Sequence, residues 1–250
     1  MGNNSIEIPR LIHLNETDST NKFMKMISEN EELPSGSIIM ADFQTAGRGQ
    51  RGNTWESEAG KNLTFSTLFR PSDMPAEMPF TISEMISLSV KYMLDKYITD
   101  ISVKWPNDIY YRDKKIAGIL IENTINQRKI SKSIIGIGIN INQTEFYGDA
   151  TNPTSMAQIT GCTFDLIAIM EEFRRIFTIQ SERINNKHFD LIHKDYLNSV
   201  YRRDGYYKYR DATGVFEAAI HDIEPSGQLI LKQADGTSSR YAFKEVSYLI

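Results

Sequence analysis

The sequence has few of the residues that build covalent or metal frameworks. Its 250 residues include one cysteine and four histidines. A single thiol excludes an internal disulfide and a zinc site made of several cysteines, and we expect Cys162 to be a small buried hydrophobic residue near the start of a helix. His13, His188, His193 and His221 show no metal-ligand spacing. A built-in metal is therefore not expected.

Excess positive charge and long apolar runs are missing as well. The 28 Lys and Arg residues against 32 Asp and Glu residues give a net charge of −4. This charge leaves no overall basic field for nucleic acid or an anionic membrane. The apolar runs are far shorter than the ~20 residues of a spanning helix, and the opening Met-Gly-Asn-Asn-Ser lacks the apolar stretch of a signal peptide. We therefore expect a cytoplasmic protein that does not bind membranes.

The rest of the composition is that of an ordinary globular protein, with 40% hydrophobic and 24% charged residues. A chain of this length buries roughly 70–75% of the surface that it exposes when unfolded. One substantial core is expected, in one large domain or in a large and a small one.

Hydrophobic periodicity predicts helices before, between and after strands. Three-and-four spacing from Ile82 to Tyr97 predicts an amphipathic helix, and the segment from Asp18 to Asn21 predicts a capped helix start. The expected strands are residues 37–41, 63–69, 101–105, 108–111, 116–123 and 131–141, and the expected later helices are residues 164–183 and 188–200. Strand 63–69 alternates as a half-buried strand does, and the last four strands predict an antiparallel meander. This order indicates an α+β fold.

The pattern changes near Tyr201. Short alternating stretches at residues 215–223, 229–233 and 240–243 are broken by Pro225-Ser226-Gly227 and Asp235-Gly236, which is typical of tight hairpins. We expect two domains, residues 1–200 and a small β barrel of residues 201–250.

Glycine and arginine gather between Gln44 and Trp55. The glycines at positions 47, 49 and 52 allow backbone amides to approach a phosphate, while Arg48 and Arg51 carry planar forks that grip phosphate or carboxylate oxygens. Neither a following helix nor a Lys-Ser/Thr pair is present, which excludes the dinucleotide fingerprint and the P-loop. The segment predicts an anion-binding loop. A flexible basic surface loop explains the glycines and arginines but not the adjoining Gln44 and Trp55.

The next segment is Lys-Trp-Pro-Asn-Asp at 104–108, followed by Lys-Ile-Ala-Gly at 115–118. Pro106 forces an extended or turned backbone, so Asn107 and Asp108 are held at a strand junction. Asp108 can accept from a ligand or help to place a divalent cation, and Lys115 can neutralise charge on a phosphate or carboxylate. A turn aspartate and a solvated strand lysine explain the same residues.

The third segment alternates glycine with isoleucine and ends in asparagine. Gly136 and Gly138 leave one face of the strand without side chains, which weakens a strand unless another backbone or a flat ligand packs there. Asn140 then lies where its amide can bind the edge of a heterocycle.

Taken in this order, the three segments resemble the motifs of biotin protein ligases, which activate biotin with ATP and pass it to a lysine of a carrier protein. The Asp18-Ser19-Thr20-Asn21 start also matches, and the resemblance runs from about Ile12 to the C-terminal barrel. It implies a class II synthetase-like catalytic domain, with a mixed or antiparallel sheet flanked by helices, and an SH3-like C-terminal β barrel.

The resemblance also implies roles for individual residues. Lys115, Arg48 and Asp108 would act in catalysis, with Asp108 a candidate base or orienter for the acceptor amine. Biotin would be bound by Ser19, Thr20, Asn21, Gln44, Gly47, Arg48, Lys115 and Gly118. ATP and the adenylate would be bound by Arg48, Arg51, Trp55, Lys104, Asn107, Asp108 and Asn140. Magnesium would arrive with ATP, and the protein partner would be a biotin carboxyl carrier domain.

The sequence departs from some relatives in two places. Gln50 stands where they carry a further arginine, which bears on how tightly the adenylate is retained. Repressor-type members also carry an N-terminal winged helix for DNA, whereas here the Ser-Thr-Asn motif begins within the first twenty residues. We therefore expect a ligase without a repressor function or a DNA partner.

Two other functions and one assembly are compatible with these features. A lipoate or octanoate ligase or transferase shares the general fold, but usually lacks the segments at 47–52 and 104–108. A non-catalytic RNA- or nucleotide-binding module would use the Arg-Gly loop alone. Relatives dimerise through a sheet edge, and residues 131–141 are the candidate edge strand for a homodimer.

Overall fold

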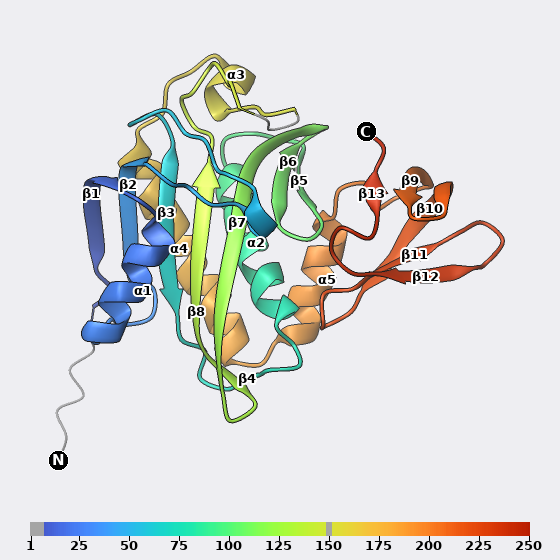
Figure 1. The fold of residues 1–250 in the computed structure, drawn as a ribbon, viewed down its shortest axis with the longest axis horizontal. Helices are drawn as coiled ribbons and strands as arrows, with labels where there is room; N and C mark the ends of the chain where they lie inside the picture. Colours follow the sequence, from blue (N-terminus) through green and yellow to red (C-terminus); the bar gives the residue numbers. More distant parts are fainter. Residues whose placement is uncertain (1–7, 149–151) are drawn as a thin grey trace.

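The computed structural model describes residues 8–148 and 152–250, and a mixed eight-stranded sheet forms the centre of this part of the chain (Figure 1). In spatial order the strands are β1 (Leu11–Thr17), β2 (Ile38–Gln44), β3 (Leu63–Phe69), β8 (Lys129–Ile139), β7 (Lys114–Asn126), β6 (Asp108–Tyr111) and β5 (Ile101–Lys104), and the short β4 (Met74–Pro75) pairs with β8. Strands β1 and β2 are parallel, and the other pairs are antiparallel.

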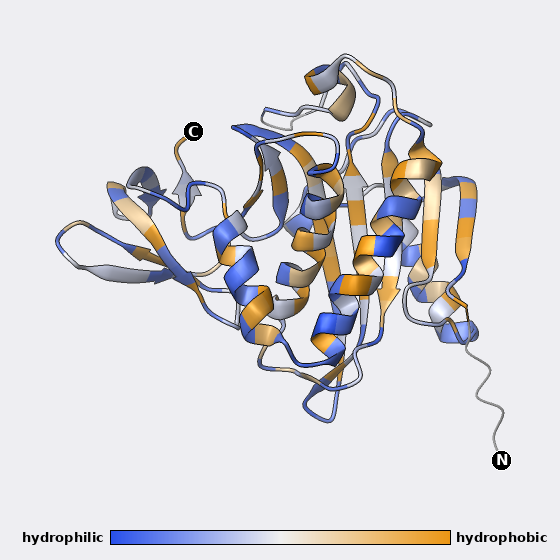
Figure 2. Cartoon of the chain, turned by 180° about the vertical axis from the view of Figure 1, so that it is seen from behind, coloured by the Kyte–Doolittle hydropathy of each residue, from blue (hydrophilic) through white to orange (hydrophobic). Residues whose placement is uncertain are grey.

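Helices cover both faces of this sheet. Helix α1 (Thr20–Asn30) packs on β2, β3 and β8, whereas α2 (Phe80–Leu94), α4 (Leu166–Asn185) and α5 (Phe189–Ser199) lie on the opposite face (Figure 2). The short α3 (Met156–Thr160) and the 3-10 turn η1 (Gln50–Gly52) lie outside these layers. The mixed sheet flanked by helices confirms the predicted fold class. Within the described residues, no helix is both long and apolar enough to cross a membrane.

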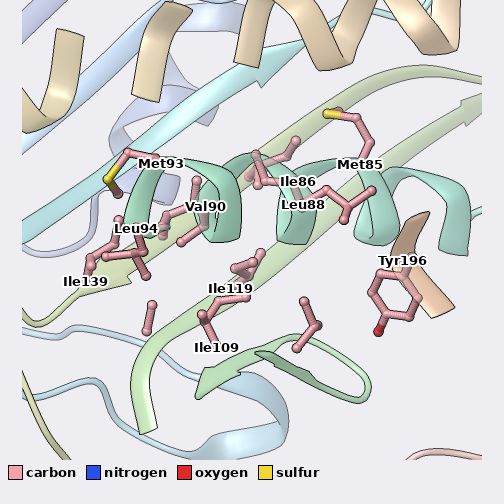
Figure 3. Close-up of a cluster of buried hydrophobic side chains, with 14 of the residues drawn as sticks. Met85, Ile86, Leu88, Val90, Met93, Leu94, Ile109, Ile119, Ile139 and Tyr196 are labelled. Carbon is pink, nitrogen blue, oxygen red and sulfur yellow. The ribbon is translucent and has the colours of Figure 1, made fainter. Parts of the chain in front are cut away.

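Helix α2 is the centre of the main core. Its apolar residues pack between the sheet and helices α4 and α5, and Figure 3 shows them in one cluster with Ile109, Ile119 and Ile139 of the strands and Tyr196 of α5. The helix follows the predicted periodicity but ends at Leu94, earlier than expected. Burial of this apolar surface is the dominant favourable contribution to folding.

The meander from β5 to β8 is confirmed, but two expectations about single strands are wrong. All of β3 is buried rather than half-buried, because α1 packs on one face and α4 on the other. Strand β8, expected as a dimer edge over residues 131–141, lies between β3 and β7 and is hydrogen-bonded on both sides. An interior strand has no unpaired backbone to offer a second chain.

Cys162 is exposed, which corrects the expectation that it is buried. Helix α3 ends at Gly161, whose φ of 73° turns the chain, and α4 begins only after Asp165 caps it. Cys162 therefore lies in the connection between two helices and not on an apolar helix face.

A second sheet follows the helices. It is antiparallel, in the order β12 (Ser238–Tyr241), β11 (Leu229–Lys232), β10 (Gly214–Ile223), β9 (Tyr207–Asp211) and β13 (Ser247–Tyr248). Its buried residues belong to the same apolar cluster as those of α2, and the Tyr201 amide donates to the Val103 carbonyl of β5 at 2.9 Å. The hairpins are confirmed, while the barrel and the division after residue 200 stay predictions.

The interface between α4 and β3 gives a test of the core. Phe173 is fully buried, with its ring centroid 4.9 Å from that of Phe65 and 5.8 Å from that of Phe177. Phe173→Ala should lower the free energy of unfolding by about 3–5 kcal/mol, because removal of the ring leaves a cavity between Phe65 and Phe177. The measurement is urea denaturation. Ile179→Ala, on the exposed side of the same helix, should change it by at most about 0.5 kcal/mol. Equal values for the two variants would contradict this packing.

Candidate functional site

One cavity of about 940 Å³ brings most of the predicted site residues together. It lies between the start of α1, the loop after β2, the β5–β6 turn, the paired strands β7 and β8, and the end of the second sheet. The predicted residues that line it are Ser19, Thr20, Asn21, Gln44, Arg48, Trp55, Lys104, Asn107, Asp108, Lys115, Gly118 and Asn140. Segments far apart in sequence therefore meet at one place.

Two predicted residues do not line the cavity in this way. Gly47 is buried beside it, and a Cβ there would lie 2.5 Å from the Trp55 carbonyl oxygen. The Trp55 amide also donates to the Gly47 carbonyl at 3.1 Å. The close backbone approach that this glycine permits is thus to the loop itself. The side chain of Arg51 lies outside the described part of the structure.

A hydrogen-bonding network whose cavity-lining side chains are uncharged forms one end of the cavity, the neutral end. The Thr20 amide donates to Gln44 Oε1 at 2.8 Å, which turns the Gln44 amino group away from Thr20. Asn21 Nδ2 donates to Glu122 Oε2 at 2.8 Å, and the Ser66 hydroxyl lies 2.6 Å from Asn21 Oδ1 and 2.8 Å from Thr20 Oγ1. These contacts orient the side-chain amides of Asn21 and Gln44.

Ser66 and Glu122 were missed by the sequence analysis. Ser66 is fully buried on β3, and it seemed a solvent-facing residue because the strand was expected to be half-buried. Glu122 is an exposed residue of β7 that orients Asn21 rather than lining the cavity. No signal in the sequence singled these two residues out, because both strands carry other polar residues.

A glycine face forms the floor of the cavity. Gly118 and Gly138 are paired across β7 and β8, and a Cβ on Gly138 would lie 2.2 Å from Trp55 Cε2. The indole of Trp55 itself therefore packs where the sequence predicted another backbone or a flat ligand. Its Nε1 is buried without a hydrogen-bond partner, a state that costs about 1–3 kcal/mol. A flat ligand with an acceptor atom would suit this surface.

The opposite end of the cavity is cationic. Lys115 Nζ lies 2.7 Å from Asp108 Oδ1, and both side chains are about one-quarter exposed. Lys104 Nζ donates to the Tyr110 hydroxyl at 3.0 Å and lies 5.3 Å from the centre of the Tyr248 ring. Burial lowers the pKa of Lys104, and the nearby Asp108 opposes this shift. Two lysines share one carboxylate here, which favours a bound anion.

Asn107 and Asn140 are partly committed to the backbone. Asn107 Nδ2 donates to the Ile119 carbonyl, and the Ile119 amide donates back to the Asn107 carbonyl at 3.2 Å. Asn140 Nδ2 donates to the Thr154 carbonyl at 3.0 Å. Both residues therefore hold the β5–β6 turn and the end of β8 in place, and the Trp105–Pro106 peptide in that turn is cis.

The second sheet completes the wall beside the cationic end. Residues that the sequence analysis did not identify contribute to this wall, namely Phe243, Lys244, Val246, Ser247 and Tyr248. Trp105 Nε1 donates to the Gly227 carbonyl at 3.0 Å, which ties this sheet to the β5–β6 turn. In residues 8–148 and 152–250, no group of three or more His, Cys, Asp or Glu side chains could hold a metal ion.

The glycine face can be tested by its effect on Trp55. In a Trp105→Phe background, which removes the other of the two tryptophans, Gly138→Ala should shift the fluorescence emission to longer wavelength. The added methyl cannot coexist with the indole at 2.2 Å, so the ring must move toward water. Ser131→Ala, an exposed position on the same strand, should leave the emission unchanged. An unaltered spectrum for Gly138→Ala would contradict the packing of Trp55 on β8.

Two sequence comparisons cover most of the chain. The bifunctional ligase/repressor BirA of Bacillus subtilis is 27% identical over 236 residues, which are 93% of this chain and 72% of that protein. The biotin–[acetyl-CoA-carboxylase] ligase of Paracoccus denitrificans is 26% identical over 230 residues, which are 89% of this chain and 94% of that protein.

A solved structure and a family model agree with these relatives. The biotin protein ligase from Aquifex aeolicus in complex with biotin and ATP superimposes with a TM-score of 0.78, at 26% identity, covering 96% of this chain and 98% of that one. The model of the Biotin/lipoate A/B protein ligase family matches residues 14–140. This match spans β1 to β8 and includes the glycine face, the cationic pair and the hydrogen-bonding network, and so the chain belongs to the Biotin/lipoate A/B protein ligase family.

Proposed function

We propose that this protein is an ATP-dependent biotin protein ligase. It activates biotin to biotinyl-5′-AMP with release of pyrophosphate, and then transfers biotin to a lysine of the carrier domain of a biotin-dependent carboxylase. The observation that carries the proposal is a single cavity with a neutral hydrogen-bonding end and a cationic end. The names of the Paracoccus ligase and of the Aquifex complex support the same chemistry.

The neutral end suits the ureido ring of biotin. That ring presents a carbonyl acceptor and two N–H donors, and Ser19, Thr20, Asn21 and Gln44 offer oriented partners of both kinds. The dithiolane ring of lipoate offers no such groups and would leave these buried polar atoms unpaired. A site built to hydrogen-bond its substrate rejects an analogue without the matching groups by factors on the order of 10⁴. This argument favours biotin over the lipoate or octanoate alternative.

The cationic end suits the first reaction. An oxygen of the biotin carboxylate attacks the α-phosphorus of ATP, the bond to the bridging oxygen breaks, and pyrophosphate leaves. Two anions must meet, so Lys115 and Arg48 are proposed to neutralise them, with Lys104 beside the phosphates. Magnesium enters as part of the MgATP substrate and supplies further charge neutralisation. Holding the two groups in register contributes an effective molarity on the order of 10⁵ M or more.

The remaining nucleotide contacts follow from the glycine face. We place the adenine near Trp55, with Asn107 and Asn140 beside it. Each asparagine donates to a backbone carbonyl, so its Oδ1 atom is the one proposed to accept from the adenine amino group.

The second reaction passes the acyl group to an amine. A lysine of the carrier attacks the carbonyl of the mixed anhydride and AMP leaves, after the ammonium has lost its proton. Asp108 is proposed to orient that amine or to take its proton, since its carboxylate already faces an ammonium at 2.7 Å in Lys115. No nucleophile of the enzyme itself is needed.

Three further parts of the proposal concern context. The reaction is placed in the cytoplasm, where ATP and the carboxylase partner are available. We propose no role in DNA binding for the described residues, because a net charge of −4 gives no overall attraction to a polyanion. A homodimer stays a prediction, and it needs another surface than β8, for example the edge at β1.

Biotin-dependent exchange of labelled pyrophosphate into ATP tests the proposal. The purified protein with Mg²⁺ should catalyse exchange with biotin and not with lipoate or octanoate. Lys115→Gln should lower kcat/KM by about 10²–10³-fold, because it removes a charge aimed at the reacting oxygens. Lys208→Gln, an exposed lysine of β9 away from the cavity, serves as the matched control. Exchange with lipoate or octanoate instead would move the protein to the neighbouring activity, and no exchange with any acid would refute adenylation.

Arg48 gives a separate test of adenylate retention. Its exposed guanidinium lines the cavity, and a charge-assisted hydrogen bond contributes about 1.5–3 kcal/mol. Arg48→Ala should therefore release free biotinyl-AMP about 10–100-fold faster, as measured by trapping the adenylate with a soluble amine. Arg128→Ala, on the exposed β7–β8 turn, should release it at the original rate. Equal release from both variants would remove Arg48 from the adenylate site.

A further inference from the structure

A histidine bridges two carboxylates that belong to different parts of the fold. His193 of α5 places Nδ1 2.7 Å from Glu84 Oε1 and Nε2 2.9 Å from Asp222 Oδ1. Glu84 belongs to α2, and its side chain is only 4% exposed. Asp222 belongs to β10 of the second sheet and is 44% exposed. The imidazole therefore joins the helical layer to the second sheet.

With both carboxylates ionised, both contacts are hydrogen bonds only when the imidazole is charged. A neutral imidazole has one N–H, whereas two ionised carboxylates can only accept, so satisfying both requires both ring nitrogens to be protonated. The hydrogen bond to Glu84 is the main cause that raises the pKa of His193 to about 9, against desolvation, and Asp222 adds to it. Burial raises the pKa of Glu84, and the hydrogen bond from His193 opposes this shift. The buried Tyr196 hydroxyl is a further titratable group that interacts with Glu84.

Other contacts connect this bridge to the cavity wall. The turn after β10 makes two such contacts. The Pro225 carbonyl accepts from the Phe80 amide at 3.2 Å, and the Gly227 carbonyl accepts from the Trp105 indole at 3.0 Å. Strand β10 pairs with β9, and β9 pairs with β13. Strand β13 carries Ser247 and Tyr248 of the wall. We expect a shift of β10 against α2 to be passed to this wall through the pairing of β10, β9 and β13.

We propose that His193 is a positioning residue, whose charged form fastens β10 to α2 and so holds the wall at residues 243–248 beside Lys104 and Asp108. Nothing in the bridge touches the cavity, and His193 does not line it. Its effect on the reaction rests on the proposed ligase function, because it acts through the shape of the nucleotide end.

The bridge gives the wall a defined pH dependence. A histidine whose pKa is raised on folding contributes stability that is complete below its unfolded pKa, near 6.5, and is lost as the pH rises through the folded pKa, near 9. Above this pH one carboxylate loses its donor, and Asp222 of the second sheet loses its ionic contact with His193. The KM for ATP is therefore expected to rise between pH 7.5 and 9.5, with a smaller change in kcat.

The test compares His193→Gln with His221→Gln, an exposed histidine of β10, in the full-length protein. At pH 7.5, His193→Gln should raise the KM for ATP about tenfold in pyrophosphate exchange, with kcat within about twofold, and should flatten the rise of KM with pH. His221→Gln should behave as the unsubstituted protein. A tenfold fall in kcat at unchanged KM, or a pH profile that His193→Gln leaves unaltered, would overturn the proposal.

A structural measurement separates this inference from the ligase proposal. Hydrogen exchange at pH 7.5 should show faster exchange of residues 241–249 in His193→Gln and in Asp222→Asn than in His221→Gln. Asp222→Asn leaves the Glu84–His193 pair intact, and it is the variant that tests the bridge if His193→Gln does not fold. Unchanged protection in Asp222→Asn overturns the positioning role, whatever the activity. Faster exchange of this segment in a protein without pyrophosphate exchange supports the bridge and refutes the ligase function.

Discussion

The site depends on the antiparallel pairing of β7 with β8. That pairing sets Gly118 opposite Gly138, which creates a surface without side chains in the middle of an otherwise isoleucine-rich sheet. The same strand β7 carries Lys115 three residues before Gly118 and Glu122 four residues after it, or roughly 10 Å and 13 Å along an extended chain. One rigid strand therefore sets the spacing between the cationic end, the flat floor and the hydrogen-bonding end.

The two ends of the cavity are built by different physical means. At the neutral end, a chain of hydrogen bonds orients the side-chain amides of Asn21 and Gln44, and this selects a ligand by its donors and acceptors. At the other end, lysines outnumber their carboxylate partner, and this selects a ligand by its charge. The proposed substrate of the first reaction is one that satisfies both ends together, through a ureido ring and a carboxylate that meets ATP.

Local pattern was enough to predict much of the fold. The meander from β5 to β8, α2 and the last two long helices were read from alternation, three-and-four spacing and turn residues, all of which act over a few neighbouring positions. The assignment of residues from the three glycine- and lysine-containing segments to one site rested on their resemblance to a family. In the structure, residues of all three segments line the same cavity.

The errors and omissions have a common physical origin in contacts between distant segments. The burial of β3 depends on α1 and α4, and the interior place of β8 depends on β3 and β7, so neither strand carries this information in its own sequence. Folding of distant segments is also what brings Ser66, Glu122 and the wall at residues 243–248 to the site. The His193 bridge joins residues more than one hundred positions apart on one side, and nothing in the spacing of the histidines indicated it.

Trp55 has a consequence for the energetics of the first ligand to arrive. Its indole rests on the glycine floor at the cost of an N–H group without a partner, so the protein carries an internal competitor for that surface. A planar ligand can bind this surface only after the ring has moved. Its apparent affinity is therefore lower, in proportion to the fraction of molecules in which the indole occupies the glycine floor. A ligand that supplies an acceptor to the indole N–H recovers part of this cost, and the surface thereby favours heterocycles over hydrocarbons of the same size.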